Sequence, residues 1–264
     1  MRRSRSFVDQ RRERIAEMVG SEGRVSVADL AERLEASLPT IRRDLEHLER
    51  EGRLARRYGE ALMVNPAAEG RAQDEAEAFR ERSRDAIARA VAELVGPGET
   101  IFVGGSSTAL QVVSHITSAD VTIITNNTNI IGRPLPPDCT VLFSGGELRT
   151  PRGYLCGEIA LNSLRLACPT KALLGCSGIS LAKGVLCTAL QEAPVDSVVI
   201  ERASETYLLA DSAKLLVESG FRYADIDQID LLVTDARASS DTLSEFLHAG
   251  LRDVLQLDPD EGIA

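Results

Sequence analysis

The residues best suited to chemistry in this chain of 264 residues are arginines near its N-terminus. Thr40, Arg43 and His47 stand at positions i, i+3 and i+7, a spacing that places them on one face of a helix. Arg42 and Glu46 flank that face. An arginine guanidinium is planar and can pair with guanine O6 and N7 or clamp a phosphate, so this spacing favours contact with double-stranded DNA.

A second set of polar residues follows an apolar run later in the chain. The segment GGSST at 104–108 combines glycines, which let the backbone approach a ligand, with hydroxyl donors. Lys214 is one of three lysines beside 27 arginines, and its compact ammonium can bind a phosphate. The structural alternatives are an ordinary strand-to-helix turn and a surface lysine that starts a helix. Taken together, the two features favour a phosphate-binding site.

Helix signals surround the N-terminal arginines. An apolar stripe predicts a first helix that ends at the glycines of 20–23. Ser26 is expected to cap a second helix, with Asp29 three residues later as in a capping box. After a very short turn, Ser37 is expected to cap a third helix, with Pro39 in its first turn. The side chains expected to face the core are Ile15, Met18, Val19, Leu30, Leu34, Leu38, Ile41, Leu45 and Leu48.

Two short helices joined by a tight turn, with arginines early in the second one, follow the helix-turn-helix plan. The segment 52–59 is expected to form a small wing in which Arg53, Arg56 and Arg57 contact the DNA backbone. The alternative is that the arginines form the solvated face of an ordinary helical bundle. Because the caps, the short turn and the basic wing agree with one another, DNA contact is the stronger interpretation.

From Thr100 on, short apolar runs alternate with helical patterns. Such runs, apolar on both faces, are typical of a mostly parallel sheet that helices cover on both sides. Small or polar residues follow several runs, and in open α/β sheets ligands bind beyond these strand ends. A helix from about Asp74 to Val95 precedes them. The expected strands contain residues 101–103, 121–124, 141–143, 172–174, 207–209 and 231–233.

The net charge of −10 is divided unevenly along the chain. Residues 1–60 hold 14 arginines and 12 acidic residues, so the acidic excess belongs to the remainder. An acidic body repels a phosphate backbone, whereas an arginine-rich head binds it if the basic side chains share a face. The five cysteines form no C-x-x-C pair, which indicates a reduced cytosolic compartment, and no run approaches the roughly twenty apolar residues of a membrane span.

The N-terminal segment resembles the winged helix of DeoR-type bacterial transcription regulators. The strings LAERL at 30–34, TIRRDL at 40–45 and G-x-L-x-R at 52–56 carry the resemblance. Two positions depart from the family pattern. Glu35 stands where a turn glycine is usual, which predicts strain in the turn, and Gly59-Glu60 stands where two glycines are usual in the wing.

The resemblance continues more loosely through the rest of the chain, and it implies a sensor domain. Such domains resemble sugar-phosphate isomerases and CoA transferases, and they bind phosphorylated metabolites at the strand ends. Here Gly104 replaces an aspartate, Ser106 a glycine, Asp196 a lysine and Thr170 an aspartate. These changes alter the charge of the pocket and leave open whether it binds an ordinary sugar phosphate, another metabolite or none.

The likeness to isomerases raises the alternative of a sugar-phosphate isomerase-like enzyme with a fused DNA-binding head. Such catalysis needs a base near a carbonyl carbon and a proton-shuttling partner. Glu192, Asp211 and Asp235 are the candidate acids, but the three histidines all fall in helix patterns. The sequence shows no metal-ligand spacing, Ser/His/Asp order or Walker loop. We therefore predict no catalytic residue, metal site or cofactor.

The sequence predicts an α/β protein with a winged helix-turn-helix DNA-binding domain at 1–63, a linker at 64–76 and a mostly parallel α/β effector-binding and oligomerisation domain at 77–264. We expect a cytoplasmic, homo-oligomeric repressor of a metabolic operon that is released from operator DNA by a small phosphorylated metabolite. The expected DNA contacts are Ser26, Ser37, Pro39, Thr40, Arg42, Arg43, His47, Arg53, Arg56 and Arg57. The expected effector contacts are Gly104, Gly105, Ser106, Ser107, Thr108, Asn126, Gly145, Gly146, Glu192, Asp211 and Lys214.

Overall fold

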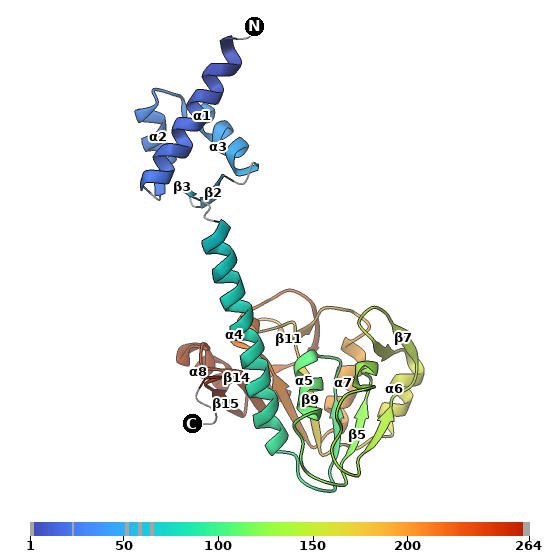
Figure 1. The fold of residues 1–264 in the computed structure, drawn as a ribbon. Coiled ribbons are helices and arrows are strands. Elements are labelled where there is room, and N and C mark those ends of the chain that lie inside the picture. Colours follow the sequence, from blue (N-terminus) through green and yellow to red (C-terminus); the bar gives the residue numbers. More distant parts are fainter. Residues whose placement is uncertain (1–2, 23, 51–52, 58–59, 64–65, 261–264) are drawn as a thin grey trace. The chain divides into compact units, whose positions relative to one another are not determined.

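The computed structural model describes residues 3–22, 24–50, 53–57, 60–63 and 66–260 (Figure 1). The chain divides into two compact units, residues 1–76 and residues 77–264, called here the head and the body. None of the described helices is long and apolar enough to cross a membrane.

The described part of the head contains three complete helices, the first turns of a fourth, and a three-stranded antiparallel sheet of order β1-β3-β2. Its elements are α1 (Arg3–Glu22), β1 (Arg24–Ser26), α2 (Val27–Arg33), α3 (Leu38–Arg50), β2 (Leu54–Arg57) and β3 (Glu60–Met63). The predicted wing is therefore the β2–β3 hairpin, whose tip at residues 58–59 lies outside the described residues. The core consists of Ile15, Val19, Val25, Leu30, Ile41, Leu45, Leu48 and Leu54, each at most 4% exposed.

The cap signals place the two helices of the helix-turn-helix as predicted. The Ser26 hydroxyl accepts a hydrogen bond from the Asp29 amide at 3.0 Å, and Ser37 Oγ accepts one from the Thr40 amide at 3.4 Å. In the turn between these helices, Glu35 has a φ of +48°, the left-handed conformation that favours glycine. The prediction for Leu38 was wrong, because as the first residue of α3 it precedes the buried stripe and is 44% exposed.

The body is built on a seven-stranded parallel sheet of order β15-β14-β12-β9-β4-β5-β6. All six predicted strands belong to it. The strands are β4 (Thr100–Val103), β5 (Thr122–Thr125), β6 (Thr140–Phe143), β9 (Lys171–Gly175), β12 (Glu205–Leu209), β14 (Leu231–Asp235) and β15 (Asp253–Leu257). Strand β15 was not predicted, because this edge strand is polar on one face and only partly buried.

Alternate side chains of the central strands feed two hydrophobic cores, one on each face of the sheet. Ile101 and Val103 pack with α4 (Pro66–Glu93) and α5 (Ser107–Val113), whereas Phe102 between them packs on the opposite face. That opposite face is covered by α6 (Glu158–Arg165), α7 (Ala193–Arg202) and α8 (Ser240–His248). The predicted two-sided parallel sheet is thus confirmed.

Smaller elements complete the body. A hairpin joins β7 (Glu147–Arg149) and β8 (Tyr154–Cys156), and a second sheet has the order β10-β11-β13. Its strands are β10 (Gly178–Ser180), β11 (Gly184–Cys187) and β13 (Phe221–Ala224). Three short 3-10 helices are η1 (Thr128–Ile130), η2 (Ser212–Lys214) and η3 (Ile226–Gln228).

Helix α4 begins at Pro66, before Asp74, where the sequence patterns placed its start, so it occupies most of the predicted linker. The stretch read as a linker from 64 onward lacks an apolar period, which hid the helix. Its alanines and glutamates nevertheless have high helix propensity, and a proline is tolerated at the first helical position. Residues 64–65 lie outside the described residues.

Candidate functional site

The exposed face of α3 carries the predicted pair of arginines. Arg42 and Arg43 are exposed, and neither makes a hydrogen bond or ion pair with another described residue. Thr40 is half-buried and its hydroxyl shares a 2.7 Å hydrogen bond with Ser37, while His47 is also half-buried. Two unpaired guanidinium groups on a helix that is anchored on its other side can approach a polyanion without breaking internal bonds.

Asp44, next to these arginines in sequence, fixes the orientation of α3. It is 1% exposed, and its two carboxylate oxygens receive Arg11 Nε at 2.6 Å and Arg12 Nε at 3.0 Å. Both arginines belong to α1, so the clamp ties the reading helix to the first helix of the head. No sequence pattern marks this clamp, because an acid between charged neighbours on a helix resembles part of a solvated face.

The three arginines predicted for the wing differ in their position and contacts. Arg53 precedes β2, and its Nη2 lies 2.8 and 2.9 Å from the two carboxylate oxygens of Glu13 on α1. Both side chains are largely exposed, and such pairs contribute little to stability, so a DNA phosphate can replace Glu13. Arg56 and Arg57 lie in β2, paired in register with Ala61 and Glu60 of β3, and their side chains are outside the described part of the structure.

In the body, a pocket of about 640 Å³ lies at the carboxyl ends of β4, β5, β9 and β12. The segment after β4 supplies part of its wall, and Ser106 there caps α5 by accepting the Ala109 amide at 3.0 Å. Gly175 at the end of β9 makes room for this segment, because a Cβ at that position would lie 2.4 Å from Ser106 Cβ. The sequence-predicted residues that line the pocket are Gly105, Ser106, Ser107, Thr108, Asn126, Glu192, Asp211 and Lys214.

Three predicted residues do not line the pocket. Gly104 packs against the end of β9, where an added Cβ would meet Leu174 at 3.0 Å. Gly145 and Gly146 follow β6, which the strand order places at the sheet edge, beyond β5. Gly146 has a φ of +102° and no room for a side chain beside the Cys156 carbonyl, so its role is in chain packing.

The pocket is rich in basic side chains for an acidic protein. Lys214 and Arg133 have no ion pair with any residue that the structure describes. Arg152 Nη1 lies 3.3 Å from Glu192 Oε1, and Arg84 Nε of α4 lies 3.8 Å from Asp211 Oδ2. The three arginines were missed because they come from a helix and two loops that no motif linked to the strand ends.

The pocket also contains buried acceptors that nothing satisfies. Asn126 Oδ1 and Asp211 Oδ1 lack a hydrogen-bond partner among the described residues, although these side chains are only 1% and 5% exposed. Both residues line the pocket, and buried polar atoms are almost always paired, so these oxygens are suited to accept from a donor group of a ligand or from water. The third candidate acid, Asp235, lies outside the pocket and accepts the Ser212 and Arg237 amides at 2.7 and 3.0 Å.

Asp196 lines the same pocket from the first turn of α7. It is 8% exposed, and its carboxyl makes no hydrogen bond or ion pair with another described residue. Burial, and secondarily the nearby Glu192 carboxylate, raises the pKa of Asp196 from 3.8 to about 8. The group is therefore mostly protonated at neutral pH, which leaves the basic side chains in the majority.

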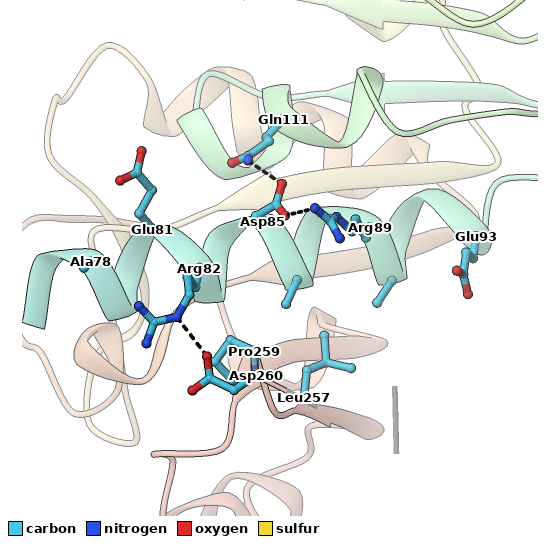
Figure 2. A pocket seen from close by; sticks show the side chains of 12 residues that line it. Ala78, Glu81, Arg82, Asp85, Arg89, Glu93, Gln111, Leu257, Pro259 and Asp260 are labelled. Carbon is cyan, nitrogen blue, oxygen red and sulfur yellow. Dashed lines mark hydrogen bonds and ion pairs between the residues drawn. The ribbon is translucent and has the colours of Figure 1, made fainter. Parts of the chain in front are cut away.

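A second groove of about 1,050 Å³ runs between α4 and the segment after β15 (Figure 2). Its two arginines are already paired: Arg89 lies 2.6 Å from Asp85, which also accepts from Gln111 at 3.0 Å, and Arg82 lies 2.9 Å from Asp260. The other charged side chains of the groove, Glu81 and Glu93, are acids. The pocket at the strand ends, where cations and acceptors are unpaired, is therefore the candidate site for an anionic ligand. Across the described chain, no three His, Cys, Asp or Glu side chains gather as a metal site.

A family model described as the DeoR C terminal sensor domain matches residues 80–236, and one described as the DeoR-like helix-turn-helix domain matches residues 11–67. The chain belongs to the DeoR family. This assignment confirms the predicted family, and the head and body described above are its DNA-binding and sensor regions.

Similar DeoR-family proteins are transcriptional repressors. The glycerol-3-phosphate regulon repressor of Escherichia coli K12 is 29% identical over 230 residues, which cover 86% of this chain and 90% of the relative. The lactose phosphotransferase system repressor of Streptococcus mutans is 30% identical over 233 residues, covering 87% and 92%. A solved D-ribose-5-phosphate isomerase in complex with phospho-erythronic acid aligns over 52% of this chain and 55% of its own, with 12% identity and a TM-score of 0.38. The DeoR-family chain is a transcriptional regulator rather than an enzyme.

Proposed function

We propose that this protein represses a metabolic operon by placing α3 on operator DNA, and that a small phosphorylated metabolite in the pocket of the body releases it. The observation that carries the proposal is that one chain has both features: two unpaired arginines on an anchored helix, and a pocket at the strand ends that is lined by cations. The names of the relatives, which include a glycerol-3-phosphate regulon repressor, support the effector class. The protein acts in the cytoplasm, where operator DNA is found.

The DNA half of the proposal is tested with operator duplexes selected from a random pool. Arg43→Ala should weaken operator binding by about 1–3 kcal/mol, the usual worth of an arginine that reads a guanine. Arg14→Ala is the matched control, since Arg14 is an exposed arginine of α1. Equal affinities of the Arg43 variant and the wild-type protein in a gel-shift titration would contradict the role of α3.

The effector half is tested by a thermal-shift screen of phosphorylated sugars, polyols and nucleosides against the full chain. A ligand that binds only the folded state raises the melting temperature. Lys214→Ala should keep operator binding and lose release by the ligand found, because the unpaired ammonium is the pocket's compact phosphate contact. Lys183→Ala, which removes an exposed lysine paired with Glu218, is the control. Release of the Lys214 variant at the same ligand concentration would contradict the phosphate role.

The protein also acts as a homo-oligomer in this proposal, because paired heads bind repeated half-sites. The edge strand β6 supports it: Leu142 and Phe143 there are 49% and 42% exposed, and Ile159 of the neighbouring α6 is 68% exposed. Exposed apolar side chains at an open sheet edge invite pairing with another chain. Light scattering should show Leu142→Glu as a smaller species, and Leu247→Glu on α8 should keep the wild-type mass. A Leu142 variant of unchanged mass would move the interface elsewhere.

A further inference from the structure

The pocket contains two kinds of unsatisfied group that call for different parts of a ligand. Lys214 and Arg133 are cations without an ion pair in the described structure, and they suit a phosphate. Asn126 Oδ1 and Asp211 Oδ1 are unpaired acceptors. A phosphate dianion offers only acceptors, so it cannot satisfy them. Hydrogen-bond donors elsewhere on a ligand, or ordered water, are needed to satisfy them.

The identity of the unpaired atoms is fixed by their neighbours. Asn126 Nδ2 donates to the Leu155 carbonyl at 3.3 Å, so the free atom of this amide is its carbonyl oxygen. Asp211 Oδ2 faces Arg84 at 3.8 Å, and Oδ1 remains free. Hydroxyl groups of a polyol or a sugar are donors that satisfy such acceptors.

The buried carboxyl group of Asp196 is suited to a cationic group of a ligand rather than to a hydroxyl. The group that acts on it electrostatically is Glu192 at the start of α7, which is not a cation, and Asp196 in turn raises the pKa of Cys187 of β11 and of Tyr223 of β13. The Tyr223 hydroxyl already donates to the Gly175 carbonyl at 2.8 Å, and Cys187 Sγ to the Ala189 carbonyl at 3.3 Å.

Arg152, which lines the same pocket, does not neutralise Asp196. Arg152 pairs with Glu192 and with Thr188 Oγ1 at 2.7 Å, and no contact joins it to Asp196. A buried carboxyl without a cation must keep its proton, as the raised pKa of Asp196 reflects. A ligand ammonium would let Asp196 ionise and form a charge-assisted hydrogen bond, roughly twice as strong as a neutral one.

We propose that the effector is a phosphorylated amino sugar or amino polyol, with its phosphate on Lys214 and Arg133 and its ammonium group on Asp196. The inference rests on the proposed phosphate pocket and goes further by naming the second functional group of the ligand. The donors on the remaining carbon atoms then satisfy Asn126 and Asp211.

Matched pairs of probes that differ in one group test this directly. The pairs are glucosamine 6-phosphate with glucose 6-phosphate, galactosamine 6-phosphate with galactose 6-phosphate, and serinol phosphate with glycerol 3-phosphate. Titration calorimetry of the full-length protein at pH 7 should show the amine of at least one pair binding about tenfold or more tightly than its hydroxyl partner. An N-acetylated form of that amine should lose the advantage, because its nitrogen carries no charge.

Two variants assign the preference to one side chain. Asp196→Asn keeps the shape and should reduce the difference within the pair to about twofold or less, since a neutral amide cannot form the ion pair. Glu201→Gln is the matched control, because Glu201 is an exposed acid on the same helix. Unchanged operator binding by both variants in a gel shift shows that they are folded.

The outcomes separate this inference from the proposed function. If phosphorylated compounds bind but no amine is preferred, the inference is overturned and the phosphate-responsive repressor stands. A preference that survives in Asp196→Asn overturns the assignment to Asp196. If no member of any pair binds, the proposed phosphate site falls together with the inference.

Discussion

Replacing Asp196 by asparagine should stabilise the body in a strongly pH-dependent way. In the folded chain the pKa of this carboxyl is raised from 3.8 to about 8 by burial and by Glu192. Between these two pH values the unfolded chain has lost the proton while the folded chain still holds it. The unfolded state therefore binds fewer protons, and the free energy of unfolding falls as pH rises from about 4 to about 8.

The size of the effect follows from the shift. Each pH unit inside this window costs the wild-type protein about 1.4 kcal/mol, which gives a loss of about 4 kcal/mol by pH 7. Counted over the measurable range from pH 5 to pH 8.5, the change is also about 4 kcal/mol, because the slope ends near pH 8. Asparagine resembles the protonated acid and does not titrate. Asp196→Asn should therefore match the wild-type protein near pH 4 and exceed its stability increasingly toward pH 8.5.

Urea titrations followed by tyrosine fluorescence measure this difference, since Tyr154, Tyr207 and Tyr223 all lie in the body. The control Glu201→Gln should follow the wild-type curve with a constant small offset. If the curves of the wild-type protein and of Asp196→Asn run parallel from pH 5 to pH 8.5, Asp196 titrates as a solvated acid. The account of the pocket as a site that lacks a counter-ion would then be refuted.

Three further variants probe how the site is positioned. Asp44→Asn should destabilise the head by about 3 kcal/mol, because two partly buried arginines lose their counter-ion. The control Asp9→Asn, on the surface of α1, should change the stability little. Calorimetry of the full chain checks both variants. Glu35→Gly should raise the stability of the head by about 0.5–1 kcal/mol by removing left-handed strain, and Glu35→Ala should not. Gly175→Ala should lower the urea midpoint of the body by an amount equivalent to about 1–3 kcal/mol, because the new Cβ meets Ser106; an unchanged midpoint would show that the loop moves freely.

Local sequence patterns predict the elements of this fold well. The cap at Ser26 and the apolar stripe of α3 fix the helix-turn-helix because each depends on neighbours a few residues away. Six strands of the large sheet, β4, β5, β6, β9, β12 and β14, are recognised from their apolar runs for the same reason. Helix α4 shows the limit of this approach: its first turns have no apolar period, so only helix propensity indicates them.

The site was predictable only where it follows a strand. Asn126 and Asp211 come directly after β5 and β12, and parallel strands bring their ends to one edge. Gly145 also follows a strand, β6. Local patterns do not reveal the order of strands in a sheet, and β6 is the edge strand, so Gly145 lies away from the pocket. Arg133 and Arg152 reach the pocket from loops, and no spacing rule connects them with it.

One ion pair connects the candidate pocket with α4. Arg84 of α4 lies 3.8 Å from Asp211 Oδ2 and 3.3 Å from Glu77, so a ligand that donates to Asp211 Oδ1 would contact a carboxylate already paired with α4. Helix α4 continues without a break from Glu93 back to Pro66, in the head. An effector alters DNA binding only if it binds two arrangements of the chain with different affinity. That difference in free energy can arise at the Arg84–Asp211 contact, because Asp211 can accept a hydrogen bond from the ligand and is also paired with Arg84 of α4.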